Sequence, residues 1–163
     1  MPCDFGFIGR ENKAMKIKDK IKQWSETLAQ LSGMDRLEYL IELGRRLTPL
    51  EPNLKIDTFK IHGCASNLWL ILIFEKEVLR LRAGADAFIT RGTAYIILDI
   101  LSGQKYKNIQ RIKIDDFASL GMTSILTPQR QNGLGSLILT IKNYANGVQI
   151  TSGISDFTTC LFR

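Results

Sequence analysis

Cysteine is the side chain in this sequence with the clearest capacity for covalent chemistry, and one of the three cysteines stands out by its position. Cys64 lies in a Gly-Cys-Ala-Ser-Asn break, residues 63–67, between two apolar segments. The glycine before it lets another backbone approach closely, and a loop between two strands presents a side chain on a rigid support. As a thiolate, Cys64 would be a nucleophile. The alternative is a small buried hydrophobic residue, because free cysteine is among the most buried residue types.

The side chains near Cys64 in the sequence offer few other reactive groups. His62, the single histidine, precedes Cys64 by two residues, so an extended strand would place both side chains on one face. A cationic His62 would then lower the pKa of the thiol, whereas a half-exposed histidine without a role is the other interpretation. Cys3 and Cys160 would complete a set of four zinc ligands with these two, but no C-x2-C pair occurs, so we expect no metal site.

The composition predicts one ordinary globular domain. The chain has 163 residues, of which 45% are hydrophobic and 23% charged, which argues against disorder. The longest apolar run, residues 68–74, is far shorter than the roughly 20 residues of a membrane helix, so no membrane partner is expected. Three cysteines without a close pair predict a reducing, cytoplasmic setting.

The net charge of +6 is concentrated near the N-terminus. The first 24 residues hold six basic and three acidic side chains, which is half of the total excess. A local charge of this kind does not indicate a nucleic-acid surface, although a basic nucleic-acid-binding module remains an alternative that rests on charge alone.

Apolar spacing predicts the helices that must position Cys64. Apolar residues recur every three or four positions in two early segments and in two later ones, at 17–31, 34–47, 87–101 and 128 to about 147. Gly44 lies on the apolar stripe of the second segment and would allow close packing there. Asp86 is placed to cap the third helix, which is apolar on most faces and should be largely buried. Pro128 fits the first turn of the fourth.

The strand signal lies between the second and third helices. Three strands are expected, at 59–62, 68–74 and 78–83, with the middle one apolar on both faces and joined to the last by a turn at 75–77.

The segment around Cys64 resembles the signature of a known family. Residues 61–70, Ile-His-Gly-Cys-Ala-Ser-Asn-Leu-Trp-Leu, are similar to the Gly-Cys-Gln-Ser-x-Val-Trp motif of the SufE family, the sulfur acceptors of iron–sulfur cluster assembly. Three further blocks occur in the family's order, at 39–44, 85–92 and 126–134. The four blocks together extend over roughly residues 20 to 146.

The resemblance implies a fold and a domain organisation. The fold would be α+β, with helices packed against a small antiparallel sheet of about three strands, in the SufE/IscU-like manner. The domain would occupy residues 16–146, with an N-terminal extension at 1–15 and a C-terminal extension at 147–163.

The resemblance also implies a function. Cys64 would accept persulfide sulfur from a SufS-like cysteine desulfurase, stimulate that enzyme, and hand the sulfur to a SufB-type scaffold. Pyridoxal phosphate would belong to the desulfurase, and this chain would hold no cofactor and would be a carrier more than an enzyme. Gly63, Ser66, Asp86 and Arg130 would support the loop and its pocket. We expect the thiol to be partly sheltered, with a raised pKa.

Three positions depart from the family's pattern. Ala65 replaces the glutamine after the cysteine, Gly84-Ala85 replaces an Asp-Ser pair, and Ile125 replaces a histidine. These changes affect how the loop is held and how the desulfurase docks. They motivate an alternative in which the protein regulates a desulfurase without carrying sulfur.

Overall fold

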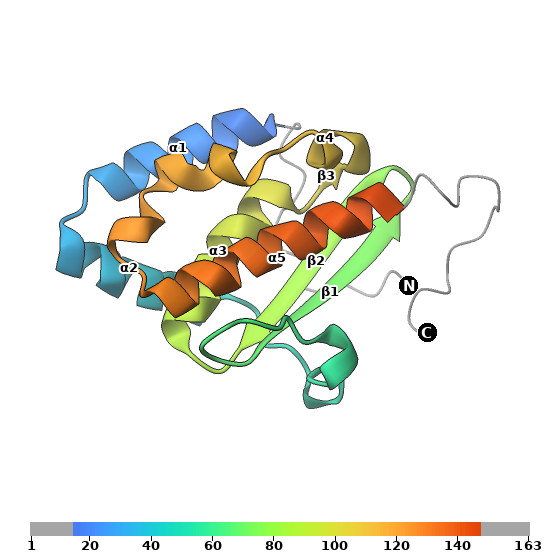
Figure 1. The fold of residues 1–163 in the computed structure, drawn as a ribbon, viewed down its shortest axis with the longest axis horizontal. Coiled ribbons are helices and arrows are strands. Elements are labelled where there is room, and N and C mark those ends of the chain that lie inside the picture. The colour runs from blue at the N-terminus through green and yellow to red at the C-terminus, as the bar shows by residue number, and fades with distance from the viewer. Residues whose placement is uncertain (1–14, 148–163) are drawn as a thin grey trace.

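The computed structural model describes residues 15–147, in which five α-helices accompany one three-stranded sheet (Figure 1). Each predicted helix is present within one or two residues of its expected position, and the α+β fold class is confirmed. The elements are α1 (Ile17–Ala29), α2 (Gly33–Arg46), β1 (Leu68–Glu75), β2 (Val78–Ala85), α3 (Phe88–Leu101), β3 (Gln104–Lys105), α4 (Tyr106–Gln110) and α5 (Pro128–Gly147), with 3-10 turns at Pro52–Leu54, Asp57–Phe59, Ile114–Leu120 and Met122–Ser124.

The sheet is antiparallel, but its third strand is not the predicted one. β1 and β2 form the expected hairpin, in which Leu68 pairs with Ala85 and Glu75 with Val78. β3 pairs with the start of β2, so β2 is the central strand and β1 lies at an edge. The prediction of a strand at 59–62 is wrong, since the chain there ends a 3-10 turn and makes an isolated bridge between Lys60 and Trp69. An alternation of only four residues was too short to specify a strand.

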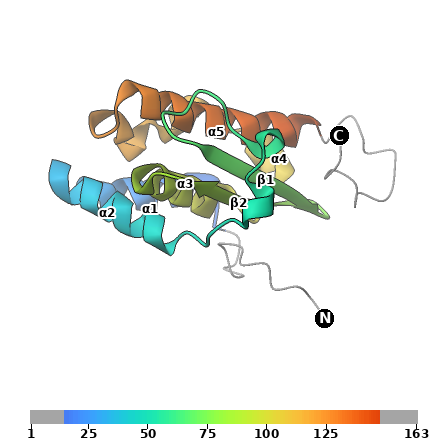
Figure 2. The ribbon, with the colours of Figure 1, turned by 90° about the horizontal axis from the view of Figure 1, so that it is seen from below.

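The two faces of the sheet are covered differently. Leu68 and Leu70 belong to the main core, together with the buried residues of α3 and α5. Figure 1 shows α5 crossing the hairpin, and the view turned by 90° shows it in a separate layer along the strands (Figure 2). Trp69 and Ile71, on the other face, form a smaller cluster with Leu50 from the segment that leads to the Cys64 loop.

α2 and α3 pack closely because each contributes a glycine to the contact. A Cβ atom on Gly92 would lie 1.8 Å from the backbone oxygen of Leu40, and one on Gly44 would lie 2.3 Å from that of Phe88. Real Cβ contacts are essentially never shorter than 3.0 Å. The close packing predicted from Gly44 is confirmed, and Gly92 is the partner that it needed.

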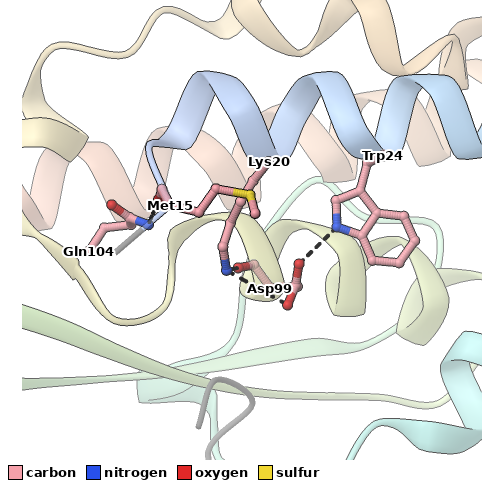
Figure 3. Close-up of polar contacts among 5 residues, drawn as sticks. All are labelled: Met15, Lys20, Trp24, Asp99 and Gln104. Carbon is pink, nitrogen blue, oxygen red and sulfur yellow. Dashed lines mark hydrogen bonds and ion pairs between the residues drawn. The ribbon is translucent and has the colours of Figure 1, made fainter. Parts of the chain in front are cut away.

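Polar side chains attach α1 to α3 and to the start of β3 (Figure 3). Lys20 Nζ donates to the backbone oxygen of Asp99 at 2.5 Å, and Trp24 Nε1 donates to Asp99 Oδ2 at 2.8 Å. Gln104 Nε2 donates to the backbone oxygen of Met15 at 2.9 Å. Asp99 is therefore a structural residue that orients the N-terminal helix. None of the helices within residues 15–147 combines the length and the apolar character that a membrane span requires.

Candidate functional site

Cys64 lies in the loop that leads from the 3-10 turn at Asp57–Phe59 to β1. A turn at His62 and Gly63 leads to Cys64, and Gly63 has a φ of 86°, a left-handed conformation that favours glycine. His62 is exposed in this turn instead of lying on a strand. His62 and Cys64 therefore do not share one face of a strand, which was the ground for expecting His62 to lower the thiol pKa.

The sulfur of Cys64 lies against the backbone of α5. A Cβ atom on Gly133 would be 2.0 Å from Cys64 Sγ, so the thiol occupies the space that a side chain at residue 133 would fill. One helical turn further along, Ser136 Oγ would be 3.4 Å from a Cβ atom on Gly63. The loop thus rests on one face of α5 through two consecutive residues.

A small, partly open cavity beside the thiol is lined by three elements. Its volume is about 10 Å³, which is about the space that one water molecule needs. Burial raises the pKa of the Cys64 thiol, and the predicted partial shelter is confirmed. Around Cys64, the walls come from β1, α3 and α5 through Leu68, Thr90, Thr93, Ala94, Arg130, Gly133, Leu134 and Leu137.

Two side-chain hydrogen bonds fasten the loop to the start of α3. Ser66 Oγ and Thr90 Oγ1 are 2.8 Å apart, and Asn67 Nδ2 donates to Asp86 Oδ2 at 2.7 Å. The backbone nitrogen of Asp86 also donates to the backbone oxygen of Asn67 at 3.2 Å. Ser66 and Asp86 are therefore both placed to hold the loop.

The prediction that Asp86 caps α3 is wrong. The helix begins at Phe88, its N-cap residue is Ala87, and no side chain makes a cap hydrogen bond there. Asp86 lies one residue too early, and its carboxylate accepts from Asn67 instead. Asp86 therefore holds the Cys64 loop through Asn67 and does not cap α3.

Arg130 and the three departures from the family's pattern have clear places. Arg130, which the resemblance implies to be a pocket residue, lines the cavity from the first turn of α5. Gly84 is a tight contact, since a Cβ atom there would lie 2.8 Å from Leu50 Cβ. Ala65 is exposed, and Ile125 packs against the main core. None of these three residues lines the cavity.

Two residues that line the cavity beside the thiol were not predicted from the sequence. Thr90 holds Ser66 and lines the cavity, but a threonine inside an apolar helix carries no distinctive signal. Gly133 did carry one, because a glycine within a helical pattern lowers helix stability and often has a packing reason. For the remaining candidates, Cys3 and Cys160 lie outside the described residues. Within residues 15–147, no group of three or more His, Cys, Asp or Glu side chains is placed to hold a metal.

Comparisons with known proteins agree with the motif. The SufE family profile, described as an Fe-S metabolism associated domain, matches residues 22–145. An uncharacterized SufE-like protein of Rhizobium meliloti is 38% identical over 118 residues, which cover 69% of this chain and 84% of that protein. One from Rhizobium etli is 33% identical over 116 residues, covering 68% of this chain and 78% of that protein.

Two further similarities concern a plant protein and the fold. SufE-like protein 1, chloroplastic/mitochondrial, of Arabidopsis thaliana is 31% identical over 116 residues, which cover 71% of this chain but only 31% of the plant protein. The solution structure of a hypothetical protein from Thermus thermophilus has the same fold, with a TM-score of 0.67 at 19% identity over 81% of this chain and 97% of that one. On its sequence, the chain belongs to the SufE family and has its role in iron–sulfur metabolism.

Proposed function

We propose that this protein is a persulfide acceptor and carrier whose reacting group is Cys64. The sulfur donor is a pyridoxal-phosphate-dependent cysteine desulfurase of the SufS type, which the protein stimulates, and the recipient is a SufB-type iron–sulfur scaffold. The observation that carries the proposal is the half-buried Cys64 thiol, seated on α5 beside a cavity whose walls are largely apolar.

The transfer is a thiol exchange that requires no oxidant. The Cys64 thiolate attacks the outer sulfur of the desulfurase's cysteine persulfide, and a new sulfur–sulfur bond forms at Cys64 Sγ. The donor's sulfur–sulfur bond breaks at the same time, and the donor cysteine leaves as a thiolate. Cys64 then carries the persulfide, and a second exchange of the same kind passes the outer sulfur to the scaffold.

The position of the thiol favours storage over spontaneous reaction. Because burial raises its pKa, Cys64 is a poor nucleophile at neutral pH in the isolated protein. Shelter also limits the access of stray thiols to a bound persulfide. The side-chain fastenings are few, namely the Ser66–Thr90 and Asn67–Asp86 hydrogen bonds, so docking of the desulfurase can release the loop and expose the thiol.

The cofactor and the compartment follow from this chemistry. Pyridoxal phosphate generates the donor persulfide and belongs to the desulfurase, so this chain needs no cofactor of its own. A reducing setting such as the cytoplasm keeps Cys64 available as a free thiol.

The proposal is tested by mass spectrometry of the intact protein after incubation with a cysteine desulfurase and free cysteine. The wild-type chain should gain the mass of sulfur, and a reductant should remove it. Cys64→Ser should abolish the gain and preserve the fold, whereas Cys3→Ser and Cys160→Ser should leave the gain unchanged. Sulfur on Cys160 and not on Cys64 would overturn the assignment. A chain that stimulates the desulfurase yet gains no sulfur would favour the regulatory alternative.

A further inference from the structure

We infer that Gly133 is a positioning residue for the Cys64 thiol. The bare backbone of α5 at Gly133 forms the seat on which the sulfur rests, and the cavity beside it has room for one additional sulfur atom. The seating of the thiol is independent of the proposed function, whereas the role of the seat in holding a second sulfur rests on it.

The contact is too close for any side chain at residue 133. A Cβ atom there would lie 2.0 Å from Cys64 Sγ, 3.2 Å from Cys64 Cβ and 3.3 Å from Cys64 Cα. The first distance requires the sulfur to move, while the other two are tight contacts that small shifts relieve. The sulfur is therefore the atom whose position depends on the glycine.

A second glycine in the same turn of α5 shows that the requirement is local. A Cβ atom on Gly135 would meet nothing within 4 Å. Residues 133 and 135 are separated by two positions, which places them on different faces of the helix. A helix-interior glycine costs about 1 kcal/mol relative to alanine. At Gly135 no contact explains that cost, whereas at Gly133 the thiol does.

The seat determines how far the thiol is exposed to solvent. Burial is the cause of the raised pKa of Cys64, so lifting the sulfur off Gly133 would bring the pKa back toward its ordinary value. The cavity beside the thiol has a volume of about 10 Å³ and apolar walls that include Leu68, Ala94 and Leu137. That volume suits one small atom, which is the outer sulfur of a persulfide.

The first experiment compares Gly133→Ala with Gly135→Ala, which is the same substitution in the same helical turn. Both are made in a Cys3→Ser/Cys160→Ser background, and the rate of Cys64 alkylation by iodoacetamide is measured across a pH series. Gly133→Ala should shift the profile to lower pH and speed alkylation near neutral pH several-fold, because a thiol that is less buried ionises more readily. Gly135→Ala should match the background protein. Identical profiles for the two variants would overturn the inference.

A double-mutant cycle separates the seat from a general effect on folding. Gly133→Ala is measured in the Cys64 background and again with Cys64→Ala, which removes the sulfur but keeps the nearby Cβ atom. The loss of unfolding free energy from Gly133→Ala should be smaller once the sulfur is absent. This comparison remains decisive where Gly133→Ala folds poorly, because the double variant should recover. An equal loss in both backgrounds would show that Gly133 serves helix packing and would contradict the inference.

The role of the seat in holding a second sulfur has its own measurement. After loading with sulfur by a cysteine desulfurase, Gly133→Ala should lose it to a small thiol faster than Gly135→Ala. Equal loss rates would overturn the role in storage. If alkylation responds as expected but no variant, nor the wild type, gains sulfur, the seat stands and the proposed function fails.

Discussion

Two glycine contacts in this protein are almost equally tight and have different consequences. At Gly92 a Cβ atom would lie 1.8 Å from the backbone oxygen of Leu40, and at Gly133 it would lie 2.0 Å from Cys64 Sγ. The first contact joins two helices whose backbones are fixed by their own hydrogen bonds. The second joins a helix to a loop side chain. The same absence of a side chain thus locks one contact and leaves the other able to separate.

The largest expected effect is on the free energy of unfolding, and it should differ between these two contacts. Gly92→Ala should lower the free energy of unfolding by about 3 kcal/mol, because overpacking that neither helix can relieve forces α2 and α3 apart. Gly133→Ala should lower it by less, since the Cys64 loop can move away. Urea unfolding monitored by circular dichroism measures both, and Gly33→Ala, where a Cβ atom would meet nothing within 4 Å, is the control. A smaller loss for Gly92→Ala than for Gly133→Ala would reverse the comparison.

The helices were predictable because their signals are local. The period of three to four residues and the proline at residue 128 are both signals contained within one or two turns of chain. β3 was missed because Gln104 and Lys105 form a strand too short to show any period. The strand expected at 59–62 did not form because an alternation of four residues is too short to specify a strand, and the segment makes only an isolated bridge to β1. The division into a domain at 16–146 and two extensions remains a prediction.

Several residues of the candidate site were predictable from the sequence, but the contacts that join them were not. Cys64 was found through its loop and its motif, but the seat on Gly133 depends on how α5 lies over the hairpin. Asp86 shows the same limit, because its position before α3 is typical of a cap, yet a donor from the Cys64 loop takes its carboxylate. Sequence identifies which residues could react, while the contacts that tune them arise between segments far apart in the chain.

An effect of intermediate size concerns the Ser66–Thr90 hydrogen bond, which holds the Cys64 loop to the start of α3. Ser66→Ala removes the hydrogen bond to the mostly buried Thr90 and should lower the free energy of unfolding by about 1 kcal/mol. It should also speed alkylation of Cys64, because the loop leaves α5 more often. Ser119→Ala, the same change at an exposed position, serves as the control. If Ser66→Ala weakens the fold without changing Cys64 reactivity, the hydrogen bond does not control release of the thiol.

A smaller effect should be visible in the dependence of stability on alkaline pH. Burial raises the pKa of Cys64 above its ordinary value of 9.0, so the unfolded chain releases this proton at lower pH than the folded chain. The contribution of Cys64 to stability is therefore complete below pH 9.0 and is lost as the pH rises through the folded-state pKa. Denaturant unfolding of the wild type and Cys64→Ser across this range isolates it.

The Cys64→Ser variant is needed because the pKa of a second group, Tyr95, is also raised in the folded protein. Burial, followed by the nearby Asp99 carboxylate, raises the pKa of Tyr95 above 10.0, and that contribution remains in both proteins. The stability curves of the wild type and Cys64→Ser should therefore be parallel below pH 9.0 and converge above it. Curves that stay parallel throughout would mean that the thiol is as accessible in the folded protein as in the unfolded chain.

The smallest expected effect concerns the Asn67–Asp86 hydrogen bond, which is the second side-chain contact that holds the Cys64 loop. A true helix cap would make Asp86→Ala cost about 1 kcal/mol, but Asp86 is exposed and bonds Asn67 instead. We therefore expect a loss of a few tenths of a kcal/mol, and the same loss for Asn67→Ala, because each variant removes the same solvent-accessible hydrogen bond. The double variant should be no less stable than either single one by urea unfolding. Additive losses would show that Asp86 supports the start of α3 by itself, and the Cys64 loop would then be fastened chiefly by Ser66 and its seat on α5.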